Sequence, residues 1–131
     1  MSIKNSWYDA EKTIILMQYT APWTWDQYAE SVRNVYAMAD AQGVTADIII
    51  YSLDRQMPQG NPLVLAKNLY RHPDEYDSLW VYVNSNPLVK TFVHIFEVLS
   101  PAHRDHSFFA ESIEAAAQMI HERRMRKAAN Q

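Results

Sequence analysis

Short apolar runs alternate with longer segments of helical spacing along most of the chain. The apolar runs have the length of strands, and we expect strands at 13–19, 47–53, 78–83 and 107–109. A further strand is expected around Trp7-Tyr8-Asp9, because only the polar turn at 10–12 separates these residues from the first run. Two strands joined so tightly form an antiparallel hairpin.

Two helices are marked by residues that cap helix ends. Thr24 followed by Gln27 is a capping box, and Gly43 suits the end of the helix that they begin. Ser112 is a preferred N-cap for the last helix of the chain. We expect the basic end of this last helix, at 123–127, to fray into a tail.

Two more helices begin at the same sequence, Asn-Pro-Leu-Val, at 61–64 and at 86–89. Asparagine is a good N-cap, and proline is tolerated in the first helical turn. The first of these helices is expected to run to about Arg71 and to stop before Pro73. The second is expected to end before Pro101.

The element order is therefore ββαβαβαβα. Alternating strands and helices predict an α/β protein, here with a mostly parallel five-stranded mixed sheet, an N-terminal antiparallel hairpin and four helices. No linker interrupts residues 1–131. We therefore expect a single domain with its core at about 5–124 and a basic C-terminal tail at 125–131.

Composition narrows the possible function classes. The 131 residues include no cysteine, which excludes disulfides, thiolate metal sites and cysteine nucleophiles. Two glycines are too few for a phosphate-binding loop. A net charge of −3 argues against nucleic-acid binding, and no apolar run approaches the roughly 20 residues of a membrane span. The N-terminal residues lack the apolar core of a signal peptide, so we expect a cytoplasmic protein without membrane insertion.

A binding edge is predicted where two expected parallel strands end and the Asn-Pro helices begin. Helices that start at neighbouring strand ends place their free N–H groups side by side, an arrangement suited to an anion or an acidic partner loop. The candidate residues of this binding edge are Ser52, Asp54, Arg55, Asn61, Asn84, Ser85 and Asn86. The alternative is that Asn-Pro is an efficient helix start that is used twice.

Aromatic side chains provide a second candidate surface. If helices cover one face of the sheet less than the other, the barer face is expected to carry Trp7, Tyr51, Trp80 and Tyr82. An exposed aromatic patch usually marks an interface, and we expect a homodimer to form through it. The alternative is that helices cover both faces and that these rings belong to the core.

No catalytic or metal-binding set is apparent in the sequence. His103, Asp105 and His106 are close together, but two imidazoles in a short loop make at most a partial metal site, so we expect surface histidines. The cations at 123–127 suit the C-terminal end of a helix. Without a recognisable nucleophile and base, we expect a protein that is not an enzyme and that needs no cofactor.

The layout resembles the STAS fold of anti-sigma-factor antagonists, and most closely the divergent STAS-like (sporulation anti-anti-sigma-like) domains. The resemblance covers about Trp7 to Arg124. The segments on which the resemblance rests are 7–9, 14–16, 23–28, 47–51 and 108–116. It implies a non-catalytic regulatory module that binds a protein partner, such as a kinase-like or sigma-regulating protein, after the third strand.

In the regulated members of this family, the start of the second helix carries a serine or threonine that a partner kinase phosphorylates. The matching position here, near Gly60-Asn61, has no hydroxyl. The resemblance therefore implies a binding edge whose phosphorylation switch is missing.

A small carrier is the alternative function. The wider fold group also resembles lipid-carrying domains, so a lipid or another apolar or anionic small molecule is the alternative ligand, bound between the sheet and the helices. We expect Trp23, Trp25 and Trp80 as wall residues of such a site.

Overall fold

Five strands form one sheet, and their spatial order is their order in the sequence. The computed structural model describes residues 2–130 and contains the strands β1 (Ile3–Trp7), β2 (Ile14–Tyr19), β3 (Asp47–Ser52), β4 (Trp80–Val83) and β5 (Ser107–Ala110). β1 is antiparallel to β2, and every later pair is parallel. The predicted mixed sheet with an N-terminal hairpin is therefore confirmed. The first strand precedes the expected position around 7–9, because Asp9 lies in the turn, where its side chain accepts the N–H groups of Thr13 and Ile14. Ile3 is buried, so the core begins before the expected residue 5.

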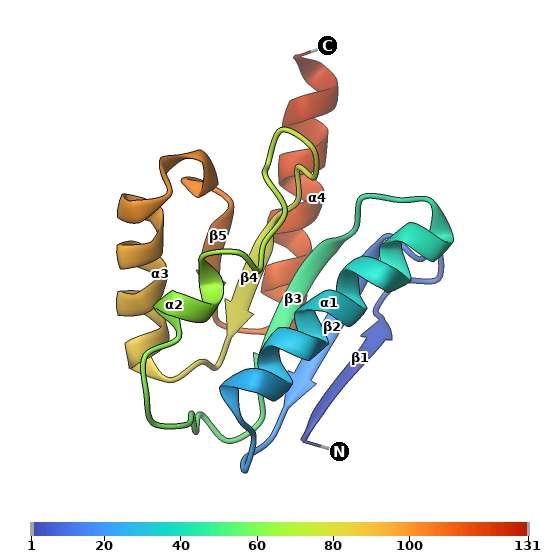
Figure 1. The fold of residues 1–131 in the computed structure, drawn as a ribbon. Helices are drawn as coiled ribbons and strands as arrows, with labels where there is room; N and C mark the ends of the chain where they lie inside the picture. Colours follow the sequence, from blue (N-terminus) through green and yellow to red (C-terminus); the bar gives the residue numbers. More distant parts are fainter. Residues whose placement is uncertain (1, 131) are drawn as a thin grey trace.

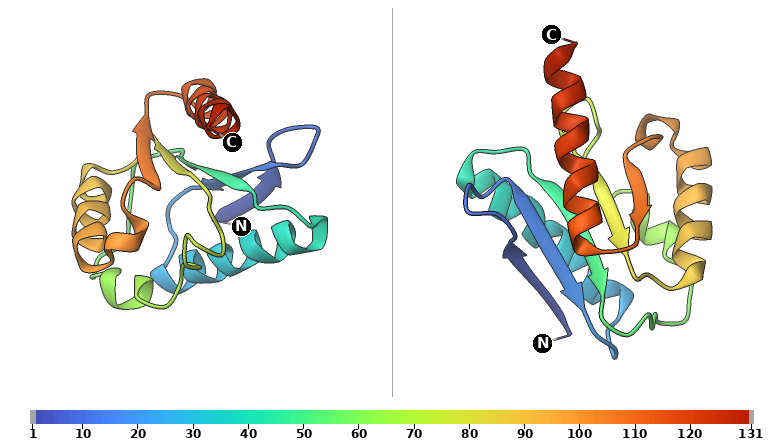
Figure 2. Two further views of the ribbon diagram at one scale, coloured as in Figure 1. Left: turned by 90° about the horizontal axis from the view of Figure 1, so that it is seen from above. Right: turned by 180° about the vertical axis from the view of Figure 1, so that it is seen from behind.

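Four helices cover the two faces of the sheet unequally. They are α1 (Trp25–Gln42), α2 (Leu63–Ala66), α3 (Pro87–Leu99) and α4 (Ile113–Ala129), and a short 3-10 helix, η1, follows α3 at Pro101–His103. Right-handed crossovers between successive parallel strands place α1, α2 and α3 on one face. α4 lies alone on the other face (Figures 1 and 2). Across residues 2–130, no helix combines the length and the apolar character of a membrane span.

The pleat of the strands assigns each side chain to one of these two faces. Ile15 of β2 aligns with Ile48 of β3, which aligns with Trp80 of β4, and all three are buried on the α1–α3 face. On the α4 face, Ile49 and Val81 belong to a second buried cluster that includes residues of α4. The sheet therefore separates two cores, of which the one beneath α1–α3 is larger.

Local signals determine where most helices begin and end. Thr24 Oγ1 accepts a hydrogen bond from the N–H of Gln27 at 3.1 Å, and Gln27 Oε1 accepts one from the N–H of Thr24 at 2.9 Å. Gly43 ends α1 with a φ of 72°, the left-handed conformation that favours glycine. Asn86 and Ser112 cap α3 and α4 with their side-chain oxygens.

α2 is much shorter than predicted. The helix expected at 61–71 is reduced to four residues. Beyond it, Tyr70 Oη lies 2.9 Å from Tyr28 Oη, and the backbone N–H of Arg71 donates to Tyr36 Oη at 3.0 Å. Both partners belong to α1. Contacts with α1 therefore hold this segment in a non-helical path, against its local helix propensity.

α4 is longer than predicted. The frayed tail expected at 125–131 is helical almost to its end. Arg124 Nη2 lies 2.7 Å from Asp47 Oδ2 of β3, and Lys127 pairs with Asp77 in the loop before β4. These ion pairs hold the basic end of α4 against the rest of the molecule.

The four aromatic residues expected on a barer face do not share a face. Trp80 and Tyr82 align with buried isoleucines of β3, so they lie beneath α1–α3 and are themselves buried. Trp7 packs against the same cluster, whereas Tyr51 packs on the α4 side. The predicted shared aromatic surface is therefore wrong, because the strand register turns Tyr51 away from the other three rings.

Candidate functional site

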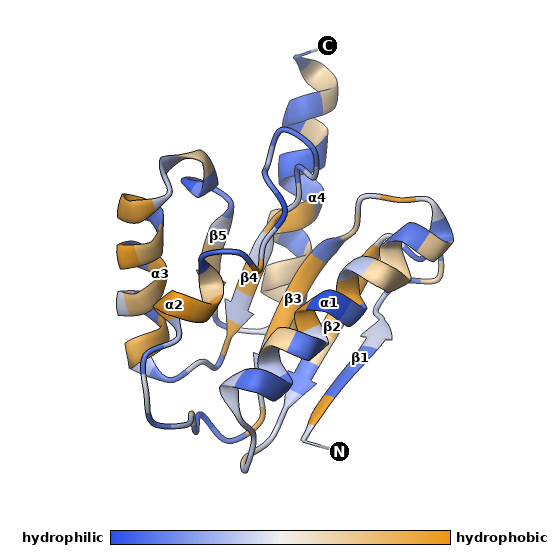
Figure 3. Cartoon of the chain, viewed as in Figure 1, coloured by the Kyte–Doolittle hydropathy of each residue, from blue (hydrophilic) through white to orange (hydrophobic). Residues whose placement is uncertain are grey.

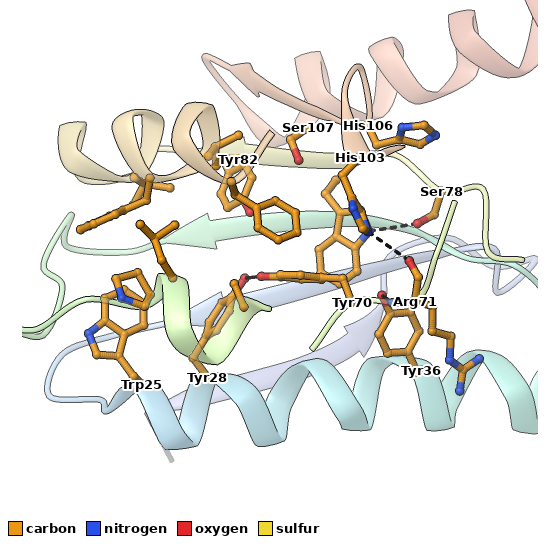
Figure 4. Close-up of a pocket in the computed structure, with 18 of the residues that line it drawn as sticks. Trp25, Tyr28, Tyr36, Tyr70, Arg71, Ser78, Tyr82, His103, His106 and Ser107 are labelled. Atoms are coloured by element: carbon orange, nitrogen blue, oxygen red, sulfur yellow. Dashed lines mark hydrogen bonds between the residues drawn. The ribbon is translucent and has the colours of Figure 1, made fainter. Parts of the chain in front are cut away.

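A cavity lies between the sheet and the three helices that cover its α1–α3 face. Its volume is about 100 Å³, and it opens to solvent on one side. It extends along α1 from Trp25 at one end to Tyr36, Ser78 and His103 at the other (Figure 4). A single water needs roughly 10–15 Å³ of such space. The cavity therefore has room for several waters or for a small organic molecule.

Aromatic rings form most of the cavity wall. Alternation along β4 turns both Trp80 and Tyr82 into it, and the buried side of α1 contributes Tyr28. Neighbouring rings pack edge to face, as Tyr70 does on Trp80 with centroids 5.3 Å apart, a geometry that aromatic pairs prefer. The aromatic residues that line the cavity are Tyr19, Trp23, Trp25, Tyr28, Tyr36, Tyr70, Tyr76, Trp80, Tyr82, Phe92 and Phe96.

α3 closes the cavity on the side away from α1. Val89, Val93 and Phe96 are among the α3 residues that line it, yet no residue of α3 is fully buried. α3 lies at the β5 side of the sheet, away from β1 and β2 (Figure 1). Apolar residues also continue onto its outer side, where Val98 and Leu99 are exposed (Figure 3). Val89 and Val93 pack against the main core cluster, but this wall of the cavity is less deeply buried than the others.

Tyrosine hydroxyls are the main polar groups at the centre of the cavity. The hydroxyl oxygens of Tyr28 and Tyr70 are 2.9 Å apart, and Tyr82 reaches toward them from β4 (Figure 4). Burial raises the pKa of all three hydroxyls well above their ordinary value of 10.0. They therefore stay neutral at physiological pH and can both donate and accept hydrogen bonds.

The far end of the cavity carries a serine and a histidine that already take part in hydrogen bonds. Ser78 Oγ accepts the indole N–H of Trp80 at 2.9 Å. His103 Nε2 lies 3.3 Å from the carbonyl of Arg71, and its Nδ1 lies 2.8 Å from Ser100 Oγ. A carbonyl only accepts, so Nε2 carries a proton. Burial lowers the pKa of His103, which favours the neutral ring with Nδ1 as an acceptor.

Arg71 lies beside this end with its charge already paired. Its two terminal nitrogens donate to the carboxylate oxygens of Asp40 at 2.8 and 2.7 Å, and its guanidinium lies 4.5 Å from the ring centre of Tyr36. Among the described residues that line the cavity, Arg71 is the only arginine or lysine. The cavity therefore offers no free cation to a ligand.

All three tryptophans expected in the wall of a carrier, Trp23, Trp25 and Trp80, line the cavity. The tyrosine cluster was not predicted, because Tyr28 and Tyr70 are 42 residues apart and only tertiary structure brings them together. The one available signal was composition, since eight tyrosines are many for a chain of 131 residues.

The residues of the predicted binding edge do come together, but they bond to one another. Ser52 is fully buried, and its hydroxyl accepts the N–H of Arg55 at 2.9 Å. Asn84 Nδ2 donates to the carbonyl of Ser52 at 2.8 Å, and Asn86 Nδ2 donates to that of Arg55 at 3.0 Å. Ser85 is half-buried between the two asparagines. The polar groups that were expected to meet a partner mainly join the loops after β3 and β4.

The pair of helix N-termini expected at this edge is not formed. α2 has only four residues, and Asn61 Oδ1 is used within its own turn, where it accepts the N–H of Leu63 at 2.9 Å. Asp54 is also engaged, since its Oδ2 accepts the N–H of Ala21 at 2.9 Å. The anion-binding argument therefore fails at α2, and binding of a protein partner at this edge stays a prediction.

The histidine loop does not form a metal site. Within residues 2–130, no three histidine, aspartate or glutamate side chains gather closely enough to hold a metal ion. His106 Nε2 lies 3.1 Å from Asp77 Oδ1. His103 and His106 are both half-buried and line the open cavity, so the expected surface histidines are only partly exposed.

The element order of the chain is the expected one, but an order of strands and helices does not identify a family or a function. No protein-family model, no curated protein and no solved structure matches the chain. Membership of the STAS-like family therefore stays a prediction from the sequence.

Proposed function

We propose that this protein binds a small, largely apolar molecule in the cavity between the sheet and helices α1–α3, as its carrier or its sensor. The observation that supports this proposal is the cavity itself, which is concave, lined mainly by aromatic rings and supplied with a few convergent hydroxyl groups. This combination is typical of small-molecule sites. The proposal favours the carrier alternative over the regulatory module that the resemblance implies.

The energetic cost of the cavity supports a functional reason for it. Unfilled volume in a closed core costs about 24 cal/mol per Å³, so the part of these 100 Å³ that is shielded from solvent lowers stability by at most about 2 kcal/mol. Natural proteins usually depart from good packing where a site requires it. A ligand that fills the space would recover part of this free energy, and binding would therefore stabilise the fold.

The walls of the cavity differ in how firmly they are held. Trp80 and Tyr82 belong to β4, which pairs with strands on both sides. None of the side chains through which α3 contacts the rest of the molecule is fully buried. We expect a ligand to enter by displacement of α3, while β4 provides the rigid side that determines its orientation.

Fluorescence titration with N-phenyl-1-naphthylamine tests this proposal, because the emission of this neutral probe rises in apolar surroundings. Val93 and Val98 are matched positions on α3: Val93 lines the cavity, and Val98 is 59% exposed. Val93→Phe places extra volume in the cavity. Overfilling a packed space costs about 1–3 kcal/mol, so we expect probe binding to weaken about tenfold or more.

The matched variant Val98→Phe adds the same volume outside the cavity and should leave the probe affinity unchanged. Urea unfolding of both variants verifies that each is folded under the titration conditions. The proposal fails if both substitutions weaken binding equally, or if the wild-type protein binds neither this probe nor a smaller neutral aromatic molecule.

A further inference from the structure

Trp23, a residue of the cavity wall, carries a buried hydrogen-bond donor that has no partner. Its side chain is only 6% exposed, and its Nε1–H is the only buried side-chain group within residues 2–130 that has no hydrogen-bond partner. A buried donor without a partner costs about 1–3 kcal/mol. The neighbouring Trp25 shows the usual arrangement, since its Nε1–H donates to the carbonyl of Gln59 at 3.0 Å.

The rings around Trp23 hold it in place. Tyr19 and Trp25 pack against it edge to face, with centroids at 5.0 and 5.1 Å, and the ring of Tyr28 lies at 6.1 Å. With aromatic neighbours on several sides, the indole cannot turn toward a protein acceptor unless the wall repacks. An acceptor that enters the cavity is therefore the natural partner for this N–H.

A second donor is available near Trp23. Tyr28, Tyr70 and Tyr82 carry three hydroxyl hydrogens, and a chain of hydrogen bonds through their three oxygens uses two of them. The third hydrogen remains available for a group inside the cavity. The wall around Trp23 thus offers an indole N–H and a phenolic O–H, both neutral.

The charges near Trp23 favour a neutral ligand. Burial and the nearby carboxylate of Asp54 raise the pKa of Tyr19 to about 12. Arg71, the cation of the lining, is paired with Asp40 and lies near the opposite end of the cavity from Trp25 (Figure 4). An anionic group beside Trp23 would lose its hydration, meet the field of Asp54 and find no countercharge, which is unfavourable.

We propose that the ligand is a neutral molecule with an apolar body of about one ring and one hydrogen-bond-accepting oxygen, and that Trp23 Nε1–H donates to this oxygen. The accepting oxygen belongs to a ketone, ester, ether or alcohol. This inference rests on the proposed function, because it assigns a ligand class and an anchoring residue to the same cavity. It excludes fatty acids and other carboxylates as the preferred ligands.

Three probes with the same number of non-hydrogen atoms test the inference. Cumene is apolar, acetophenone adds a neutral carbonyl oxygen, and benzoate carries a carboxylate. In ¹⁵N-labelled protein, NMR detects the indole N–H of each of the four tryptophans, and Trp23→Phe identifies the signal of Trp23. We expect acetophenone to move the Trp23 proton signal downfield, and the Trp25 signal to move far less because Trp25 already donates to Gln59.

Affinities in two variants give an independent readout. Trp23→Phe keeps a ring in the wall but removes the donor. It should weaken acetophenone relative to cumene by about two- to tenfold, the range that one neutral hydrogen bond supplies. Trp25→Phe is the matched control and should leave this ratio unchanged. If Trp23→Phe does not fold, Trp25→Phe still identifies the Trp25 signal. The inference then requires that acetophenone move one of the other indole signals of the wild-type protein downfield, and it is overturned if none of them moves.

The outcomes separate this inference from the proposed function. Acetophenone binding without a change in the Trp23 signal, or tighter binding of benzoate than of acetophenone, overturns the inference and leaves the proposed function standing. If none of these three probes binds, and N-phenyl-1-naphthylamine does not bind either, the proposed function is overturned together with the inference.

Discussion

Asp47 joins three parts of the molecule through one buried carboxylate. Its side chain lies at the start of β3, where Oδ1 accepts the backbone N–H of Leu79 at 2.8 Å and Oδ2 accepts Nε–H of Arg124 at 2.9 Å. Arg124 also donates to the carbonyl and the hydroxyl of Thr13, each at 3.0 Å. A buried charge is tolerated when its hydrogen bonds are complete, and it becomes costly when one partner is removed.

Replacing Asp47 with alanine is therefore expected to lower the free energy of unfolding by about 3 kcal/mol, as measured by urea denaturation. This is the lower end of the range for broken buried pairs, because the side chain of Arg124 is 35% exposed. Asp74→Ala is the control, since the Asp74 side chain is 89% exposed, and it should change stability by less than about 0.5 kcal/mol. Equal effects of the two substitutions would contradict the role assigned to Asp47.

At the scale of elements, the basic end of α4 is attached to the loop before β4 through Asp77. Burial acts to raise the pKa of Asp77, but hydrogen bonds from Lys127 and Arg123 outweigh it and lower the pKa from its ordinary 3.8 to about 2. The same carboxylate also lies 3.1 Å from Nε2 of His106. α4 is thereby connected to the loop that leads into the cavity-lining strand.

These contacts predict a pH dependence of stability. A carboxyl whose pKa is lower in the folded state contributes stability above the unfolded pKa and loses it as the pH falls through the folded value. Asp77→Asn should therefore reduce the fall in Tm between about pH 4 and pH 2 relative to the wild-type protein, measured by circular dichroism. Asp74→Asn, in an exposed position of the same loop, is the control. An unchanged slope in Asp77→Asn would show that Lys127 and Arg123 do not stabilise the folded carboxylate.

The two Asn-Pro helices show which elements local signals can predict. α3 begins where Asn86 and Pro87 predict, because the cap is formed within its own turn: Asn86 Oδ1 accepts the N–H of Leu88 at 3.0 Å. The same signal at Asn61 starts a helix that ends after four residues. Beyond this short helix, the contact between the Tyr70 hydroxyl and α1 holds the chain out of a helical path. A cap predicts where a helix starts, but tertiary contacts decide how far it continues.

At the scale of the whole molecule, the short α2 is a reason why a cavity exists. Sequential parallel strands with right-handed crossovers place α1, α2 and α3 on one face. A full-length α2 would cover the middle of that face. Because α2 is one turn long, α3 remains at the side of the sheet, and aromatic side chains from distant segments line the space between (Figures 1 and 4).

This arrangement predicts that α3 is the most easily opened of the longer helices. Few buried contacts mean low local stability, and a ligand that binds the closed form suppresses opening. Backbone amides of Pro87–Leu99 should exchange with deuterium faster than those of α1, and N-phenyl-1-naphthylamine should slow their exchange. Mass spectrometry of peptides measures both, with β3 as the internal reference. Probe binding without any protection of α3 would contradict the view that this helix closes the cavity.

The sequence by itself determined the four strands after the first, the α/β order, both ends of α1 and the start of α3 and α4. These features depend on apolar periodicity and on caps, which act within a few residues. Only the tertiary structure decided the length of α2, the extent of α4, the meeting of Tyr28 with Tyr70 and the unpaired N–H of Trp23. Each of these depends on packing between segments far apart in the chain, and residue spacing does not encode such contacts.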